Sequence, residues 1–150
     1  MFDLLTVLLF LTTALLMEPI TWFVHKYVMH GFLWSLHEDH HNHSGEERVF
    51  EKNDFFALFF SVPPALLIYG GLQNGLPLMA SAGFGVTVYG IAYFILHDMV
   101  FHKRYGLHIK PRGRYMKRLT KGHIAHHLNS GKNNEVSCGF LYADKKFDVA

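Results

Sequence analysis

The chain has 150 residues, half of them hydrophobic and 15% aromatic, with a formal net charge of +2. This length is typical of one domain, and the apolar content exceeds what a soluble domain needs. We therefore expect a single domain over residues 1–150. The one cysteine, Cys138, excludes an intramolecular disulfide and a cysteine-based zinc cluster. The basic residues lie beside apolar segments and form no known nucleic-acid-binding motif, which disfavours a nucleic-acid partner.

Three apolar segments are long enough to cross a bilayer. Residues 4–24 reach about 31 Å as a helix, at about 1.5 Å per residue. Residues 55–72 and 76–96 follow, and the Gly and Asn residues between them allow a tight reversal. The sequence predicts an all-α integral membrane protein with three transmembrane helices and a histidine-rich helical cap. Four helices are the alternative, if the third segment divides at a glycine.

The basic residues indicate how these segments are oriented. With three crossings, residues 25–54 and 97–150 share one face of the membrane and contain all fourteen Lys and Arg. Basic residues favour the cytoplasmic side. We therefore expect the cap in the cytosol and the N-terminus on the opposite side.

Histidine is the unusual residue in this chain. Twelve occur, and ten form two copies of an H-x4-H motif followed by an H-x2-H-H motif. The motifs consist of His25 and His30, then His37, His40 and His41; and of His97 and His102, then His123, His126 and His127. These ten are the predicted metal ligands, whereas His43 and His108 lie outside the motifs and are expected to be ordinary polar residues.

The spacing within the motifs predicts how the imidazoles lie. Residues i, i+3 and i+4 share one face of an α-helix, so each H-x2-H-H motif converges. The two members of an H-x4-H motif are about 140° apart on an α-helix, so one could face each of two neighbouring metals. Ten imidazoles exceed the about four to six that one ion accepts, which implies two metals. Iron is preferred because zinc has no redox chemistry, although zinc fits the same ligands and could occupy the site.

The motifs and the segments around them resemble the fatty acid hydroxylase superfamily of membrane di-iron enzymes, and most closely its bacterial β-carotene 3-hydroxylases. The resemblance covers about residues 18–142, and its most specific parts are residues 25–31, 48–54, 97–104 and 131–141. It implies that two iron ions use dioxygen to hydroxylate C3 of the β-ionone rings of β-carotene, giving β-cryptoxanthin and then zeaxanthin. It also implies a ferredoxin with its NAD(P)H-dependent reductase as electron source, and a place in the bacterial inner membrane.

Acidic residues near the motifs are candidates for orienting the imidazole N–H groups, because neutral ligands leave the metal charge uncompensated. These candidates are Glu38, Asp39, Asp54 and Asp98. For the first two, a solvated surface position is the alternative. Glu18 lies inside the first apolar segment, where we expect it to contact a lysine or a ligand histidine, or to lie near the interface.

Two other functions remain open at this point. The same histidine motifs occur in fatty acyl or sterol hydroxylases and desaturases, which share the chemistry and differ in substrate. A membrane metal-binding or transport protein is the non-enzymatic alternative. It is disfavoured because the apolar segments contain almost no ionisable residues along a possible transport path.

Overall fold

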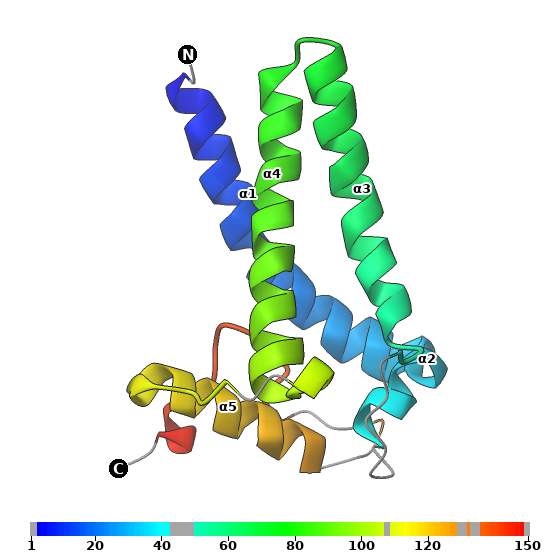
Figure 1. Cartoon of the computed structure of the whole chain (residues 1–150), viewed down its shortest axis with the longest axis vertical. Helices are drawn as coiled ribbons and strands as arrows, with labels where there is room; N and C mark the ends of the chain where they lie inside the picture. The colour runs from blue at the N-terminus through cyan, green and yellow to red at the C-terminus, as the bar shows by residue number, and fades with distance from the viewer. Residues whose placement is uncertain (1–2, 43–49, 107–108, 129–131, 133–135, 149–150) are drawn as a thin grey trace. The chain divides into compact units, whose positions relative to one another are not determined.

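The computed structural model describes residues 3–42, 50–106, 109–128, 132 and 136–148, so His43 and His108 lie outside the described residues. All secondary structure in these residues is helical, which confirms the all-α prediction. Figure 1 shows the elements, which are α1 (Leu4–Phe23), the π-helix η1 (Val24–Phe32), α2 (Trp34–His41), α3 (Asp54–Gln73), α4 (Pro77–Tyr93), the π-helix η2 (Phe94–Phe101), the 3₁₀ turn η3 (Arg104–Gly106), α5 (Gly113–Leu128) and the 3₁₀ turn η4 (Lys145–Phe147).

Three helical stretches within the described residues are long and apolar enough to cross a membrane, as the sequence predicts. They are Leu4–Phe32, Asp54–Gln73 and Pro77–Phe101. The first is longer than expected because η1 continues α1 beyond the apolar run. Leucines along these helices, such as Leu15 and Leu66, are exposed, and an apolar side chain in that position is suited to contact with lipid. The chain is therefore a helical membrane protein.

The chain divides into two compact units, of which the first comprises Met1–Met17 and Phe55–Ala92. In this unit α3 and α4 run side by side in opposite directions, joined by a turn in which Gly75 has φ +65° (Figure 1). Small residues let the helices approach closely. A Cβ on Gly83 of α4 would lie 2.7 Å from the Pro64 carbonyl oxygen, and one on Gly85 would lie 2.5 Å from the Phe10 carbonyl oxygen.

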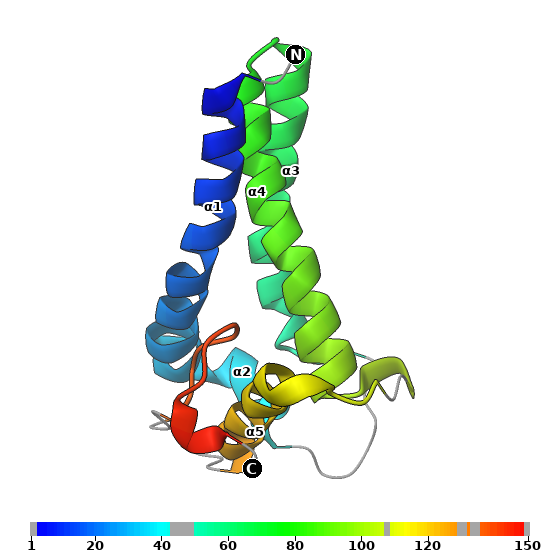
Figure 2. The same cartoon turned by 90° about the vertical axis from the view of Figure 1, so that its left-hand side faces the viewer.

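The second unit comprises Glu18–Asp54 and Tyr93–Ala150 and contains every predicted ligand. The bend at Gly31 redirects the chain from η1 into α2. Figure 2 shows the red C-terminal segment lying beside α5. Gly122 allows this contact, because a Cβ there would lie 2.7 Å from Ser137 Oγ. The Tyr115 hydroxyl also donates to the Leu141 carbonyl oxygen at 2.6 Å. The prediction of one domain over residues 1–150 stays a prediction.

Candidate metal centre

Both H-x4-H motifs lie on π-helical turns. His25 and His30 belong to η1, and His97 lies in η2 with His102 as its C-terminal cap. In a π-helix the backbone bond joins residues i and i+5, as it does from the His102 N–H to the His97 carbonyl oxygen at 3.0 Å. Residue i+5 therefore returns to the face of residue i. The ring centroids are 5.0 Å apart in the first pair and 4.6 Å apart in the second.

This geometry corrects the expectation that each H-x4-H pair is divided between two metals. The α-helical angle of about 140° does not apply on a π-helical turn. Both members of each pair instead lie in the same group of converging nitrogens.

The imidazoles form two groups, within each of which the possible ligand atoms all lie within 4.8 Å of one another. The first histidine group consists of His25, His30, His37, His41 and His126, and the second consists of His40, His97, His102 and His123. The structure thus brings together nine of the ten predicted ligands. His127, the tenth, stacks on His41 at 4.3 Å and also lies 4.5 Å from the ring of His102.

Each group takes one histidine from the other copy of the repeat. His40, the middle histidine of the first H-x2-H-H motif, lies with the second group. His126, at the equivalent position of the second motif, lies with the first group. The exchange ties α2 and α5 together, because each helix contributes to both groups.

In the first group, the contacts of the outer ring nitrogen, Nδ1, determine which nitrogen of each imidazole carries the proton. Three of its imidazoles have Nδ1 beside an oxygen acceptor: His25 beside the Cys138 carbonyl at 3.1 Å, His37 beside Asn53 Oδ1 at 2.7 Å, and His126 beside the Val136 carbonyl at 2.8 Å. A carbonyl oxygen only accepts, so Nδ1 must carry the proton and donate. In a neutral imidazole, Nε2 then has a lone pair and no proton.

Those Nε2 atoms face one another. His25 Nε2 lies 3.1 Å from His37 Nε2 and 3.1 Å from His126 Nε2. With no proton between them, three lone pairs at this distance repel unless a cation lies among them. An imidazole nitrogen binds a first-row metal at about 2.1 Å, so two such nitrogens at right angles are about 3.0 Å apart. The residues present therefore fit a metal ion.

In the second group the outer partners are carboxylates. His40 Nδ1 lies 2.8 Å from Glu51 Oε2, and His97 Nδ1 lies 3.4 Å from Asp98 Oδ1. The inner nitrogens again converge, with His40 Nε2 3.1 Å from His97 Nε2. This group also has the spacing of nitrogens around one ion.

Arg104 links the acidic residue beside His97 with the acidic residues beside His40. Its guanidinium donates to Asp98 at 2.9 Å and to both carboxylate oxygens of Asp54 at 2.8 and 2.9 Å. Asp54 also accepts the Glu51 N–H at 3.0 Å. Lys103 and Tyr105, on either side of Arg104, have φ values of 54° and 62°, which are costly for residues with a Cβ. The backbone on both sides of Arg104 is therefore held in a left-handed conformation.

Burial keeps the imidazoles neutral, as metal ligands must be. It lowers the pKa of His37 to about 3 and that of His126 to about 4. Burial, together with neighbouring imidazoles, also holds the pKa values of His40, His123 and His127 well below the usual value. Burial raises the pKa of Glu51 to about 7, against the opposing charge of Arg104. A cation bound by His40 would favour the charged form of Glu51.

The predicted acidic partners divide into two kinds. Asp98 contacts an imidazole directly, and Asp54 reaches the site through Arg104. Asp39 instead accepts the Lys52 N–H at 2.7 Å, and Glu38 is exposed on α2. The expected orienting role is thus absent from the contacts that the structure gives for these last two residues.

Several site residues were not found from the sequence. Glu51 and Asn53 alternate with Lys52 and Asp54 where α3 begins, and this cluster of polar side chains beside an apolar run is the signal that points to them. The carbonyls of Val136 and Cys138 carry no side-chain signal. Glu18, in α1, has backbone partners in the C-terminal segment. Its Oε1 accepts the N–H groups of Phe140 and Leu141 at 3.0 and 2.8 Å.

Three apolar helices and two converging histidine groups define a helical membrane protein with a candidate two-metal centre. The family model described as fatty acid hydroxylase matches residues 10–148. The chain therefore belongs to the fatty acid hydroxylase family, whose members are metal-dependent hydroxylases.

Similar proteins carry a consistent name. The chain is 42% identical to "Beta-carotene hydroxylase" of Pseudescherichia vulneris, over 95% of this chain and 79% of that protein. It is 38% identical to "Beta-carotene hydroxylase" of Paracoccus sp. (strain PC1), over 91% of this chain and 83% of that protein. It is also 39% identical to "Beta-carotene hydroxylase 2, chloroplastic" of Capsicum annuum, over 83% of this chain and 40% of that protein. No solved structure matches the chain.

Proposed function

We propose that this chain is a membrane di-iron monooxygenase that hydroxylates C3 of the β-ionone rings of β-carotene, giving β-cryptoxanthin and then zeaxanthin. The names of the similar bacterial and plant proteins support the substrate. The observation that carries the metal chemistry is the set of facing, proton-free Nε2 atoms in the first histidine group.

The ligand set of the proposal contains all ten histidines of the four motifs. His127 is equivalent by position to His41 in the repeat, and His41 belongs to the first group. By the same pattern His127 belongs to the second group. Its ring lies 4.6 Å from His123 and 4.8 Å from His40, which supports this assignment.

The position of the site suits a substrate dissolved in the bilayer. His25 and His97 lie in the last turns of the apolar stretches Leu4–Phe32 and Pro77–Phe101. A hydrocarbon ring could therefore reach the site from the hydrophobic region without first entering water. Thirteen of the fourteen basic residues lie outside the three apolar stretches, and the other, Lys26, lies near the end of the first. This distribution supports a site on the cytoplasmic face of the bacterial inner membrane and an N-terminus on the other side.

Two iron ions would supply the activation of dioxygen. In the overall reaction one oxygen atom enters the C–H bond and the other leaves as water, which requires two electrons and two protons. A ferredoxin with its NAD(P)H-dependent reductase is the proposed electron source. The protein's part is to hold the imidazoles neutral and oriented: the Nδ1–H donations of His25, His37 and His126 fix their inward lone pairs.

Reconstitution tests this function. The purified full chain is loaded with iron in detergent and supplied with β-carotene, oxygen, ferredoxin, its reductase and NADPH. We expect about two irons per chain, and β-cryptoxanthin followed by zeaxanthin. His37→Ala should abolish product formation. The matched control is Glu38→Gln, which changes the exposed neighbouring residue and should leave turnover unchanged.

The alternative functions predict other results in the same preparation. Hydroxylated or desaturated fatty acyl or sterol products, with β-carotene left unchanged, would assign a different substrate to the same chemistry. A single zinc ion per chain and no oxidised product would support a metal-binding or transport protein and contradict the proposal.

A further inference from the structure

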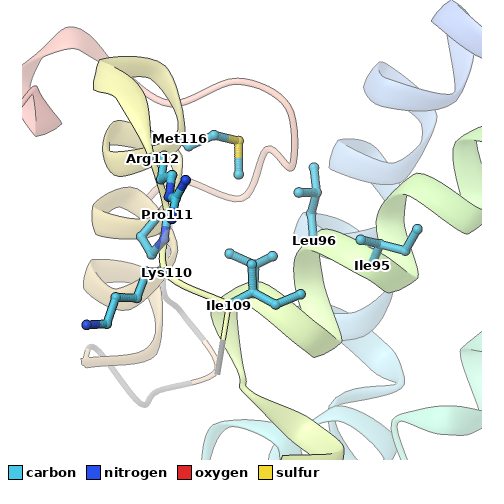
Figure 3. Close-up of a pocket in the computed structure, with 8 residues that line it drawn as sticks. Ile95, Leu96, Ile109, Lys110, Pro111, Arg112 and Met116 are labelled. Carbon is cyan, nitrogen blue, oxygen red and sulfur yellow. The ribbon is translucent and has the colours of Figure 1, made fainter. Parts of the chain in front are cut away.

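A pocket of about 660 Å³ lies in the second unit, and its lining residues include none of the candidate ligand histidines. Apolar side chains form most of its lining, among them Ile95, Leu96, Ile109 and Met116. Figure 3 shows Leu96 and Ile95 on one side of the open space and the segment with Lys110, Pro111 and Arg112 on the other. The pocket thus combines a hydrophobic wall with an edge formed by a segment that carries two cationic residues, and the Lys110 side chain extends away from Leu96 and Ile95 in this view.

The hydrophobic wall comes from the end of a membrane span. Ile95 and Leu96 belong to the last turns of the apolar stretch Pro77–Phe101. The cationic segment follows that span in the chain, where hydrocarbon gives way to lipid headgroups if the stretch crosses the bilayer. Ile95 and Ile109 are 41% and 45% exposed, so both present apolar surface to an occupant.

The two cations are available to a ligand. Lys110 and Arg112 are exposed, and among the described residues no carboxylate forms an ion pair with either. Asp54 and Asp98 form their ion pairs with Arg104. A carotenoid is a hydrocarbon with nothing for these cations to bind. An anionic amphiphile matches both parts of the pocket.

We propose that this pocket binds an anionic phospholipid, with a headgroup phosphate at Lys110 and Arg112 and an acyl chain against Ile95, Leu96 and Met116. Arginine recognises a phosphate through two parallel N–H bonds, and lysine adds a compact charge. Basic pockets at the cytoplasmic ends of membrane helices are suited to anionic headgroups. The site goes beyond the proposed oxygenase chemistry and does not depend on it.

Lipid titration tests the proposal with the full, metal-loaded chain in detergent. Dioleoyl phosphatidylglycerol or dioleoyl phosphatidylcholine is added, and native mass spectrometry counts the bound lipid. We expect a preference for phosphatidylglycerol that the double variant Lys110→Gln/Arg112→Gln reduces. Each cation is expected to contribute about fivefold, or roughly 25-fold for the pair. Ile109→Ser, at an exposed apolar position, should weaken the binding of both lipids.

The matched control is Lys117→Gln/Lys121→Gln, which removes the same charge from exposed positions on α5 that do not line this pocket. It should keep the lipid preference. Equal loss in both double variants would indicate diffuse surface charge and overturn the site, as would equal binding of the two lipids by the unchanged protein. If the pocket variant keeps its lipid preference but loses affinity for the ferredoxin of the proposed electron source, the surface serves a protein partner and the lipid proposal is wrong.

Discussion

The two histidine groups differ in what holds their outer nitrogens. In the first group, His25 and His126 donate to backbone carbonyls, and His37 faces the amide oxygen of Asn53. These acceptors are neutral. They fix the direction of each ring and leave its charge unchanged.

The second group has carboxylate acceptors in the equivalent places. His40 faces Glu51 and His97 faces Asp98, and Arg104 bonds to Asp98 and Asp54. An imidazole that donates to a carboxylate is a stronger electron donor to its metal than one that donates to an amide. It follows that two ions held here would be inequivalent. The second group would bind a divalent cation more tightly and would favour its oxidised state.

The largest expected effect comes from removing an imidazole of one repeat that lies with the histidine group of the other. His40→Ala takes a buried ligand from the second group and leaves Glu51 without its imidazole partner. Turnover should fall by at least about 100-fold, beyond the loss typical for an outer partner. Bound metal should fall from two to about one per chain, measured by elemental analysis. Loss of both metals would show that the groups do not bind independently.

Removing Arg104 tests whether the charge network belongs to the second group. Arg104→Gln leaves the Asp98 and Asp54 carboxylates without their cation. Breaking a largely buried ion pair costs about 3 kcal/mol, which thermal unfolding in detergent would detect. The control is Arg114→Gln, since that arginine is 75% exposed in its pair with Asp148 and should contribute at most about 1 kcal/mol. Similar losses for both variants would contradict the structural role given to Arg104.

A smaller change removes only the charge behind His40. Glu51→Gln keeps an oxygen acceptor for Nδ1–H but lowers the basicity of the imidazole. The affinity of the second group for metal should fall about tenfold, within the range typical of such partners. Mössbauer spectra of the iron-loaded protein should show one of two iron signals altered. Asn53→Leu is the counterpart in the first group and should alter the other signal. A change of both signals in either variant would argue against two separately supported ions.

The sequence predicted those features that depend on composition and on motif spacing. The apolar runs predicted three membrane helices, and the histidine repeats identified the side chains that converge. The assignment within each H-x4-H motif failed because it assumed α-helical geometry. The π-helical turns at His25 and His97 depend on how η1 and η2 pack, which residue periodicity does not encode.

The outer contacts were harder to predict, for a different reason. The Val136 and Cys138 carbonyls are backbone atoms, so their role depends on loop conformation and on no side-chain type. Glu51 and Asn53 lie in a connecting segment whose fold is likewise set by tertiary contacts, among them the Asp39 bond to Lys52. The exchange of His40 and His126 between groups depends on how α2 and α5 pack, which the motifs leave open.

The smallest expected effect acts on the first group alone, through a loop. Glu18 accepts the N–H groups of Phe140 and Leu141, and the same loop presents the Cys138 carbonyl to His25. Glu18→Leu removes both bonds, so this loop should shift and the His25 ring should be held less firmly. We expect the metal affinity of the first group to fall by at most about tenfold, with the second group unchanged. Glu18→Gln retains an oxygen acceptor and should restore most of the affinity, measured by competition with a chelator. An equal loss of metal affinity in the Gln and Leu variants would mean that the carboxylate charge itself matters. A loss of affinity at both groups would contradict the separate outer contacts that we assign to them.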